Sequence, residues 1–285
     1  MSRTTGLLRR AVATGISAAT TRAVRRRLDR EPPGGSAAWT RTNHAGEAVT
    51  LLEGPAVVGG LVAGTLVTDG ARLRTRLVTA SALGVVGGVG AHDDLYGATS
   101  TKGIRGHLGA LRRGEVTSGA VKIGVIGLSG LVAAAALRRE RDRRVTSAAT
   151  LMDGALIAGT ANLINLLDLR PGRALKVALA TTSPALVMPT PGAGLAAPTV
   201  GAGVAALPDD LAGKSMLGDC GANALGAAIG CAAVAAAPES ARRLLLAGVV
   251  GLTLLSEKVS FTTVIASTPW LRRLDELGRP VRRGP

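Results

Sequence analysis

The sequence predicts an all-α fold, a single-domain polytopic membrane helix bundle of about nine (roughly 8–10) transmembrane helices. Hydrophobic residues make up 47% of the 285 residues, and the mean hydropathy is +0.32, which is high for a water-soluble protein. Charge-free runs recur along the chain, at residues 54–68, 77–92, 123–137, 177–208, 220–238 and 244–256. So many apolar runs with almost no polar face would leave too little surface to solvate a soluble helical protein.

Each predicted span follows from a local pattern. The long run 177–208 exceeds one span and contains the turn signal "PTPGAG" at 189–194, so we divide it into two helices there. Residues 145–167 form a further span that holds one acid, Asp153. Glycines recur within the runs, as in "VVGGLVAG", and small residues allow close helix packing in a membrane.

The two ends of the chain are basic. Residues 6–24 are apolar but interrupted by Arg9, Arg10 and Arg22, so the N-terminal segment 1–30 is either a span, a surface helix or an anchor. Residues 270–285 form a basic tail, which we expect on the cytoplasmic side, against anionic headgroups.

The net charge and the amino-acid composition indicate which class of molecule the protein binds. The formal net charge is +15, and the arginine clusters lie between apolar runs, which favours lipid headgroups. Aromatic residues are only 1% of the chain, which argues against base stacking and hence against nucleic acid. Cys220 and Cys231 fit neither a disulfide framework nor a metal-site spacing. Richness in Ala, Gly and Arg suggests a bacterial source, and therefore the inner (plasma) membrane.

Counting crossings places three polar loops, 93–118, 165–176 and 209–220, on one side of the membrane. These loops hold most of the acids and amides that we consider candidates for chemistry, together with several basic residues, and the positive-inside rule makes that side cytoplasmic. The rule is imperfectly obeyed, because "RLRTR" at 72–76 and "RRERDRR" at 138–144 fall on the opposite side. We therefore base the prediction of one active face on the parity of the loops.

The first polar motif is the pair Asp93–Asp94 at the end of an apolar run. Adjacent carboxylates repel one another and resist burial. At a membrane boundary they can bind a divalent cation or accept a proton from a nucleophile. The alternative is a helix C-terminal loop that is merely acidic.

The second motif is "ANLINLLDLRPGR" at residues 161–173. Asn162, Asn165 and Asp168 are spaced three apart and so share one helix face. Arg170 and Arg173 follow in a tight turn, and guanidinium groups suit phosphate oxygens. The amides could instead form hydrogen bonds between packed helices.

The third motif is "SMLGDCGANALGAAIG" at residues 215–230, in which Asp219 lies between glycines just before an apolar helix. An acid at such a position can hold a metal that bridges phosphates, or can simply cap the helix. The preceding "GKS" is not a Walker A loop, because Pro208 stands where that motif requires glycine.

Together the three motifs resemble those of the polyprenyl-phosphate N-acetylhexosamine-1-phosphate transferases. That family carries "DD" after a span, "N-x-x-N-x-x-D" at the end of a later span and "GDxGAxxLG" after another, in this order. The resemblance covers roughly residues 40–268. It implies that a polyprenyl phosphate oxygen attacks the β-phosphate of a UDP-sugar and that UMP leaves, with Mg²⁺ bridging the diphosphate.

The resemblance also implies roles for individual residues. Asp219 matches a metal ligand, and Asp93 and Asp94 match an acidic pair near the lipid phosphate. Asp168 matches an acid beside the nucleotide and metal. The resemblance supports Asn43, Lys102 and Asn165 as substrate-binding residues. With those drawn from the motifs themselves, the predicted substrate-binding residues are Asn43, Lys102, Arg105, Asn162, Asn165, Arg170 and Arg173.

Two departures from the family pattern keep other functions open. Pro171 stands where the family has a second Asp, and none of the three histidines falls in the late loop where the peptidoglycan enzyme of the family has a histidine run. One alternative is a catalytically degenerate relative that binds lipid phosphate or acts as a scaffold. A remote alternative is a small-solute transporter, to which Asp153 within a span would be suited. A homodimer is compatible with the sequence.

Overall fold

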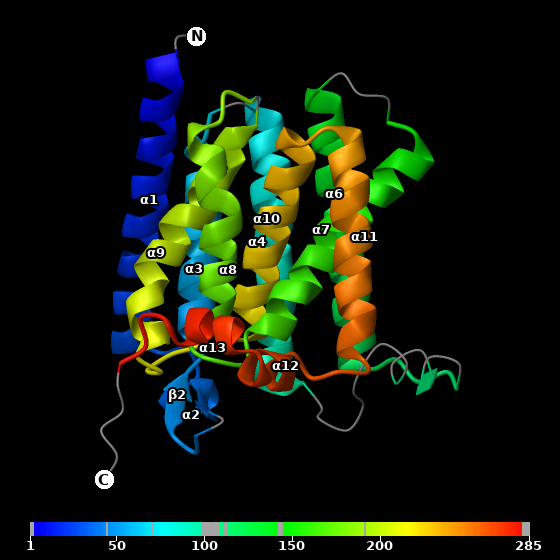
Figure 1. Ribbon diagram of the computed structural model, residues 1–285. Coiled ribbons are helices and arrows are strands. Elements are labelled where there is room, and N and C mark those ends of the chain that lie inside the picture. The colour runs from blue at the N-terminus through cyan, green and yellow to red at the C-terminus, as the bar shows by residue number, and fades with distance from the viewer. Residues whose placement is uncertain are drawn as a thin grey trace.

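A computed structural model describes residues 3–43, 45–69, 71–97, 106, 109–110, 113–141, 145–190 and 192–280. Within these residues the chain is all-helical apart from one small hairpin (Figure 1). The fold class predicted from the sequence is therefore confirmed at the level of an all-α helix bundle.

Nine helices of the described chain form the bundle, and each coincides with one of the predicted apolar segments. They are α1 (Arg3–Arg30), α3 (Glu53–Val67), α4 (Leu73–Tyr96), α6 (Ser118–Glu140), α7 (Ser147–Leu167), α8 (Arg173–Thr182), α9 (Ala197–Leu211), α10 (Gly218–Ala236) and α11 (Glu239–Ser256). Short 3₁₀ helices η1 (Ser183–Val187) and η2 (Ala193–Ala196) lie between α8 and α9, so the run 177–208 is divided as expected.

Three of the described helices are long and apolar enough to cross a membrane, namely α6, α7 and α10. A fourth candidate is the bent pair formed by α11 and α12 (Phe261–Ser267), whose axes differ by 93°. The structure thus supports several membrane-spanning helices, whereas nine spans are more than helix length and composition alone establish.

Several of the shorter elements gather at one end of the bundle (Figure 1). They comprise α2 (Ser36–Trp39), β1 (Thr40–Thr42), β2 (Ala48–Thr50), α12 and α13 (Pro269–Glu276). The two strands pair antiparallel, with Arg41 opposite Val49, and an isolated bridge joins Thr50 to Ser215. The hairpin therefore ties the chain before α3 to the segment before α10.

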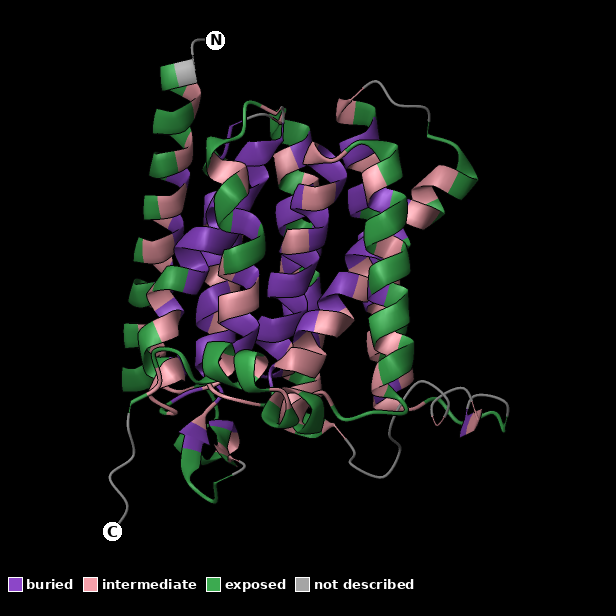
Figure 2. Cartoon of the chain, viewed as in Figure 1, coloured by how far each residue is buried: buried purple, intermediate pink, exposed green. Residues whose placement is uncertain are grey.

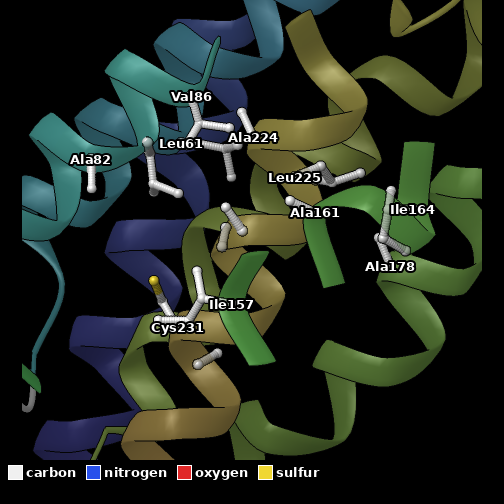
Figure 3. Close-up of a cluster of buried hydrophobic side chains, with 14 of the residues drawn as sticks. Leu61, Ala82, Val86, Ile157, Ala161, Ile164, Ala178, Ala224, Leu225 and Cys231 are labelled. Atoms are coloured by element: carbon white, nitrogen blue, oxygen red, sulfur yellow. The ribbon is translucent and has the colours of Figure 1, made fainter. Parts of the chain in front are cut away.

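Helix α10 forms the centre of the bundle, and 78% of its most apolar window is buried inside the protein. It packs against α7 and α4, and Figure 3 shows that the packing side chains are mostly small or aliphatic, such as Ala161, Ala224 and Leu225. A Cβ at Gly226 would lie 2.4 Å from the Thr160 carbonyl oxygen. Glycine at this position thus permits the close approach of α10 and α7.

The outer surface of the bundle is apolar over much of its height. Figure 2 shows exposed residues along the outer sides of α1 and α11 and buried residues inside. On α11, Leu244 is 75% exposed and Leu254 is 62% exposed. Exposed apolar surface on this scale is typical of a protein that meets lipid.

A buried ionic group lies at the end of the bundle opposite the hairpin. Asp153 of α7 accepts hydrogen bonds at Oδ2 from Arg138 Nη1 at 2.7 Å and from Arg242 Nη1 at 2.6 Å. Its side chain is fully buried, and those of the two arginines are no more than 5% exposed. This group joins α6, α7 and α11, so the acid that suits a transporter has a structural role in the bundle.

Candidate functional site

The end of α4, the end of α7 and the start of α10 converge at the end of the bundle that carries the hairpin. Gly90 brings α4 against the first turn of α10. A Cβ there would lie 2.3 Å from the Asp219 carbonyl oxygen. The three motif-bearing segments therefore meet, as loop parity predicted.

Lys122 of α6 links two of the predicted acids. Its Nζ donates to Asp93 Oδ2 and to Asp219 Oδ2, each at 2.6 Å. The three side chains are 16–23% exposed, so the group opens to solvent. An ammonium group thus bridges carboxylates from α4 and α10, which is the position that a bound cation would take.

Asp94 has a different role from its neighbour Asp93. Its Oδ1 and Oδ2 accept hydrogen bonds from the backbone N–H groups of Asp219 and Cys220, both at 2.9 Å. Both carboxylate oxygens are therefore used to cap the N-terminus of α10, where a negative charge is favourable. Arg41 of β1 in turn donates to the Asp94 carbonyl oxygen.

Asp168 follows α7 and binds the same turn of the chain. Its Oδ2 accepts from the N–H of Gly218 at 2.9 Å. Gly218 has φ +60°, and a Cβ at this position would lie 2.9 Å from Asp94 Oδ2. Burial, with the nearby carboxylate of Asp210, raises the pKa of Asp168 well above its ordinary value. Asp94 and Asp168 together fix the backbone that presents Asp219.

A second polar network, which the sequence analysis did not identify, lies behind this group. Ser215 donates to Glu53 Oε2, and Asp210 Oδ1 accepts from the N–H of Gly172 at 2.7 Å. Glu53 and Asp210 are each 2% exposed. This network joins α3, α9 and the α7–α8 turn beneath the site.

A cavity of about 230 Å³ opens beside Asp168. Its lining combines the hairpin, the α7–α8 turn and the segment before α10, and consists of Thr42, Asn43, Val49, Asp168, Leu169, Arg170, Pro171, Asp210, Ser215 and Met216. Because Asp168 lines the cavity and also binds the Gly218 N–H, the cavity is adjacent to the carboxylate group. The lining thus offers one guanidinium group, that of Arg170, beside two carboxyl groups and several hydrogen-bonding groups.

The predicted substrate-binding residues have varied positions. Asn165 lies close enough to interact with the Asp219 carboxylate. Asn162 is half-buried one turn earlier on α7, and no hydrogen bond to its side chain is found within the described residues. Asn43 accepts from the N–H groups of Ala45 and Glu47 and so shapes the hairpin loop. Lys102 and Arg105 lie outside the described residues.

Arg173 is occupied by the C-terminal segment. Its Nε and Nη2 donate to the two oxygens of Asp275 at 2.7 and 3.0 Å, and its side chain is 5% exposed. Arg279 donates to the Pro171 carbonyl oxygen at 2.9 Å. The described part of the predicted basic tail therefore docks on the α7–α8 turn.

Lys122 is the functional residue that sequence reasoning missed. It stands at the start of an apolar run, where a lysine is easily interpreted as a snorkelling side chain. The signal that could have revealed it is its place just after the loop 93–118 that begins with Asp93 and Asp94, and therefore on the same side as that pair.

The donor set fits Mg²⁺ in part. In the part of the chain that the structure describes, no three His, Cys, Asp or Glu side chains form a complete metal site. Magnesium, however, commonly takes one or two carboxylates together with substrate phosphates and water. Asp93 and Asp219 supply hard oxygen ligands, and the Lys122 ammonium group already lies between them as a cation.

Comparison with models of known protein families finds no match, and comparison with curated proteins finds none either.

Proposed function

We propose that this protein transfers a sugar-1-phosphate from a UDP-sugar to a polyprenyl phosphate carrier and releases UMP. The observation that carries the proposal is the convergence of Asp93, Asp219 and Lys122 from three helices, with 2.6 Å contacts and partial exposure. Such a group offers two carboxylates as ligands for a divalent cation and one ammonium group for a phosphate oxygen. The motif resemblance described above supplies the reaction class.

In this reaction a phosphate oxygen of the lipid carrier forms a bond to the β-phosphorus of the nucleotide sugar. The bond from that phosphorus to the α-phosphate oxygen breaks, and UMP is the leaving group. When bound, Mg²⁺ would offset the negative charge of the diphosphate. Asp93 and Asp219 would hold it, and Lys122 would offset the charge of whichever carboxylate or phosphate faces it.

Asp93 and Asp94 have different roles in the proposed reaction. Both carboxylate oxygens of Asp94 accept hydrogen bonds from backbone N–H groups of α10, so Asp94 is a positioning residue. Asp93 contacts Lys122 through Oδ2 and is partly exposed, so it is the candidate to approach the lipid phosphate. Asp168 holds the turn that carries Asp219.

We assign the nucleotide to the 230 Å³ cavity beside Asp168. Arg170 lines it and offers a guanidinium group for a phosphate oxygen, while the Asn43 side chain lies at its hairpin edge. The hydrocarbon chain of the carrier would remain in lipid, against the apolar outer surface of the bundle. In this proposal all nine bundle helices cross a bacterial inner membrane, and the site faces the cytoplasm.

The test is UMP release by detergent-purified protein supplied with polyprenyl phosphate, Mg²⁺ and a panel of UDP-sugars. We expect release with at least one sugar, and loss of at least about 100-fold in Asp219→Asn and in Asp93→Asn. Glu239→Gln is the matched control, since Glu239 is an exposed acid at the opposite end of the bundle. No release with any sugar by folded wild-type protein would reject the proposal.

A second candidate is a lipid-phosphate binder that does not catalyse transfer. Pro171 favours it, because this residue lines the cavity at the position where the transferase family has an aspartate. Binding of polyprenyl phosphate without UMP release, weakened by Lys122→Gln, would support the binder over the enzyme.

A further inference from the structure

A groove of about 390 Å³ lies between α4 and α6, away from the carboxylate site. It occupies the opposite end of the bundle, where α4 begins and α6 ends (Figure 1). Its lining consists of Arg72, Arg74, Thr75, Val78, Val132, Ala135, Ala136, Arg139 and Glu140. The proposed reaction uses none of these residues.

The rim of the groove carries an excess of positive charge. Three guanidinium groups face one carboxylate, that of Glu140. Glu140 is already engaged, because Thr75 donates to its Oε2 at 2.7 Å and Arg72 Nε lies 4.0 Å from its Oε1. Arg74 and Arg139 are exposed, and within the described chain their guanidinium groups have no ion-pair partner.

The walls of the groove are apolar and continue along the bundle. Val78, Val132, Ala135 and Ala136 form the walls, and Val132 is 48% exposed. Leu77 on α4 and Leu128 on α6 are 49% and 64% exposed. Because α6 is one of the helices able to span a membrane, this surface belongs at the depth of lipid chains.

We propose that this groove binds one anionic phospholipid. Its phosphate would accept hydrogen bonds from Arg72, Arg74 and Arg139, whose planar groups match phosphate oxygens. One acyl chain would lie along Val78 and Val132. The inference rests on the membrane-spanning bundle and not on the transfer reaction, and it gives a role to arginines that break the positive-inside pattern.

Native mass spectrometry of the detergent-purified full chain tests the proposal. The protein is titrated with phosphatidylglycerol or with phosphatidylcholine of the same acyl chains. We expect phosphatidylglycerol to bind about tenfold more tightly. The triple variant Arg72→Gln, Arg74→Gln, Arg139→Gln should lose that preference. Arg243→Gln should keep it, because Arg243 is an exposed arginine near the start of α11, at the same end.

A second variant separates a lipid from a free anion. Ala136→Phe fills the groove and leaves its charge intact, so it should weaken phosphatidylglycerol binding, and millimolar inorganic phosphate should not displace the lipid. Thermal unfolding verifies that each variant is folded. Unchanged preference in the folded triple variant, or displacement of the lipid by inorganic phosphate, would overturn the proposal.

Discussion

The two ends of the bundle each hold a three-member ionic group, and the two groups are built alike. At one end Lys122 is shared by Asp93 and Asp219 at 2.6 Å. At the other Asp153 is shared by Arg138 and Arg242 at 2.6–2.7 Å. The side chains of the first group are 16–23% exposed, whereas those of the second are 0–5% exposed.

The difference in exposure distinguishes a group that can take part in chemistry from a group that stabilises the fold. The group around Asp153, here called the sealed group, cannot exchange its partners for a ligand, so its charges serve to hold helices together. The group around Lys122, here called the open group, can exchange a protein partner for a phosphate or a cation, because water and ligand reach it. Contact distance alone would not distinguish the two.

The largest expected effect is on the sealed group. Asp153→Ala should lower the free energy of unfolding by about 3–5 kcal/mol, since it removes the buried carboxylate that two buried guanidinium groups contact. Chemical unfolding in detergent measures the loss, with Glu239→Gln as the control that changes little. A loss below about 1 kcal/mol would contradict the structural role that we infer for Asp153.

The open group should respond in the opposite way. Lys122→Met should reduce UMP release about 100-fold, because an electrostatic partner of the phosphates is lost. Its free energy of unfolding should fall by no more than about 1 kcal/mol, since the group is partly solvated. Lys258→Met, at an exposed lysine, is the control. If each folded Lys122→Met molecule released UMP as fast as wild-type protein, Lys122 would take no part in the reaction.

A smaller effect should follow from displacing α4 against α10. Gly90→Ala places a Cβ where only 2.3 Å separates it from the Asp219 carbonyl oxygen, so Asp93 and Asp219 must move apart. UMP release should fall about tenfold, and stability by about 1–3 kcal/mol. Gly88→Ala on the same helix is the matched control, as nothing lies within 4 Å of its added Cβ. Equal rates for the two variants would show that the contact does not set the geometry.

The smallest effect concerns the ion pair that docks the C-terminal segment. Burial opposes ionisation of Asp275, but hydrogen bonds from Arg173 and Arg279 hold its pKa below the ordinary value. The pair therefore stabilises the fold above the unfolded pKa of Asp275, and this contribution disappears as pH falls through the folded pKa. Wild-type protein and Asp275→Asn should differ by about 1 kcal/mol at pH 7, and the difference should shrink as the pH falls below the ordinary pKa of an aspartate. A difference that does not shrink on acidification would refute the assignment.

The sequence predicted the bundle well because apolar runs and breaks are local signals. The division of the run 177–208 followed from its length and its turn signal, and the shared end of Asp93, Asp168 and Asp219 followed from loop parity. The distinct roles of Asp93 and Asp94 did not, since capping depends on which backbone N–H groups α10 presents. The pairing of Arg173 with Asp275 joins residues about a hundred positions apart, which no local pattern reveals.

The enclosed position of α10 has a consequence for biogenesis. Over their most apolar windows α10 has a mean hydropathy of 1.3 and is 78% buried, whereas α6 reaches 2.0 and is 33% buried. Its partners α3, α4 and α7 all precede it in the chain and leave the ribosome first. We therefore expect α10 to enter the membrane by joining helices that are already assembled, so that truncation before Gly218 would leave an open bundle and no site.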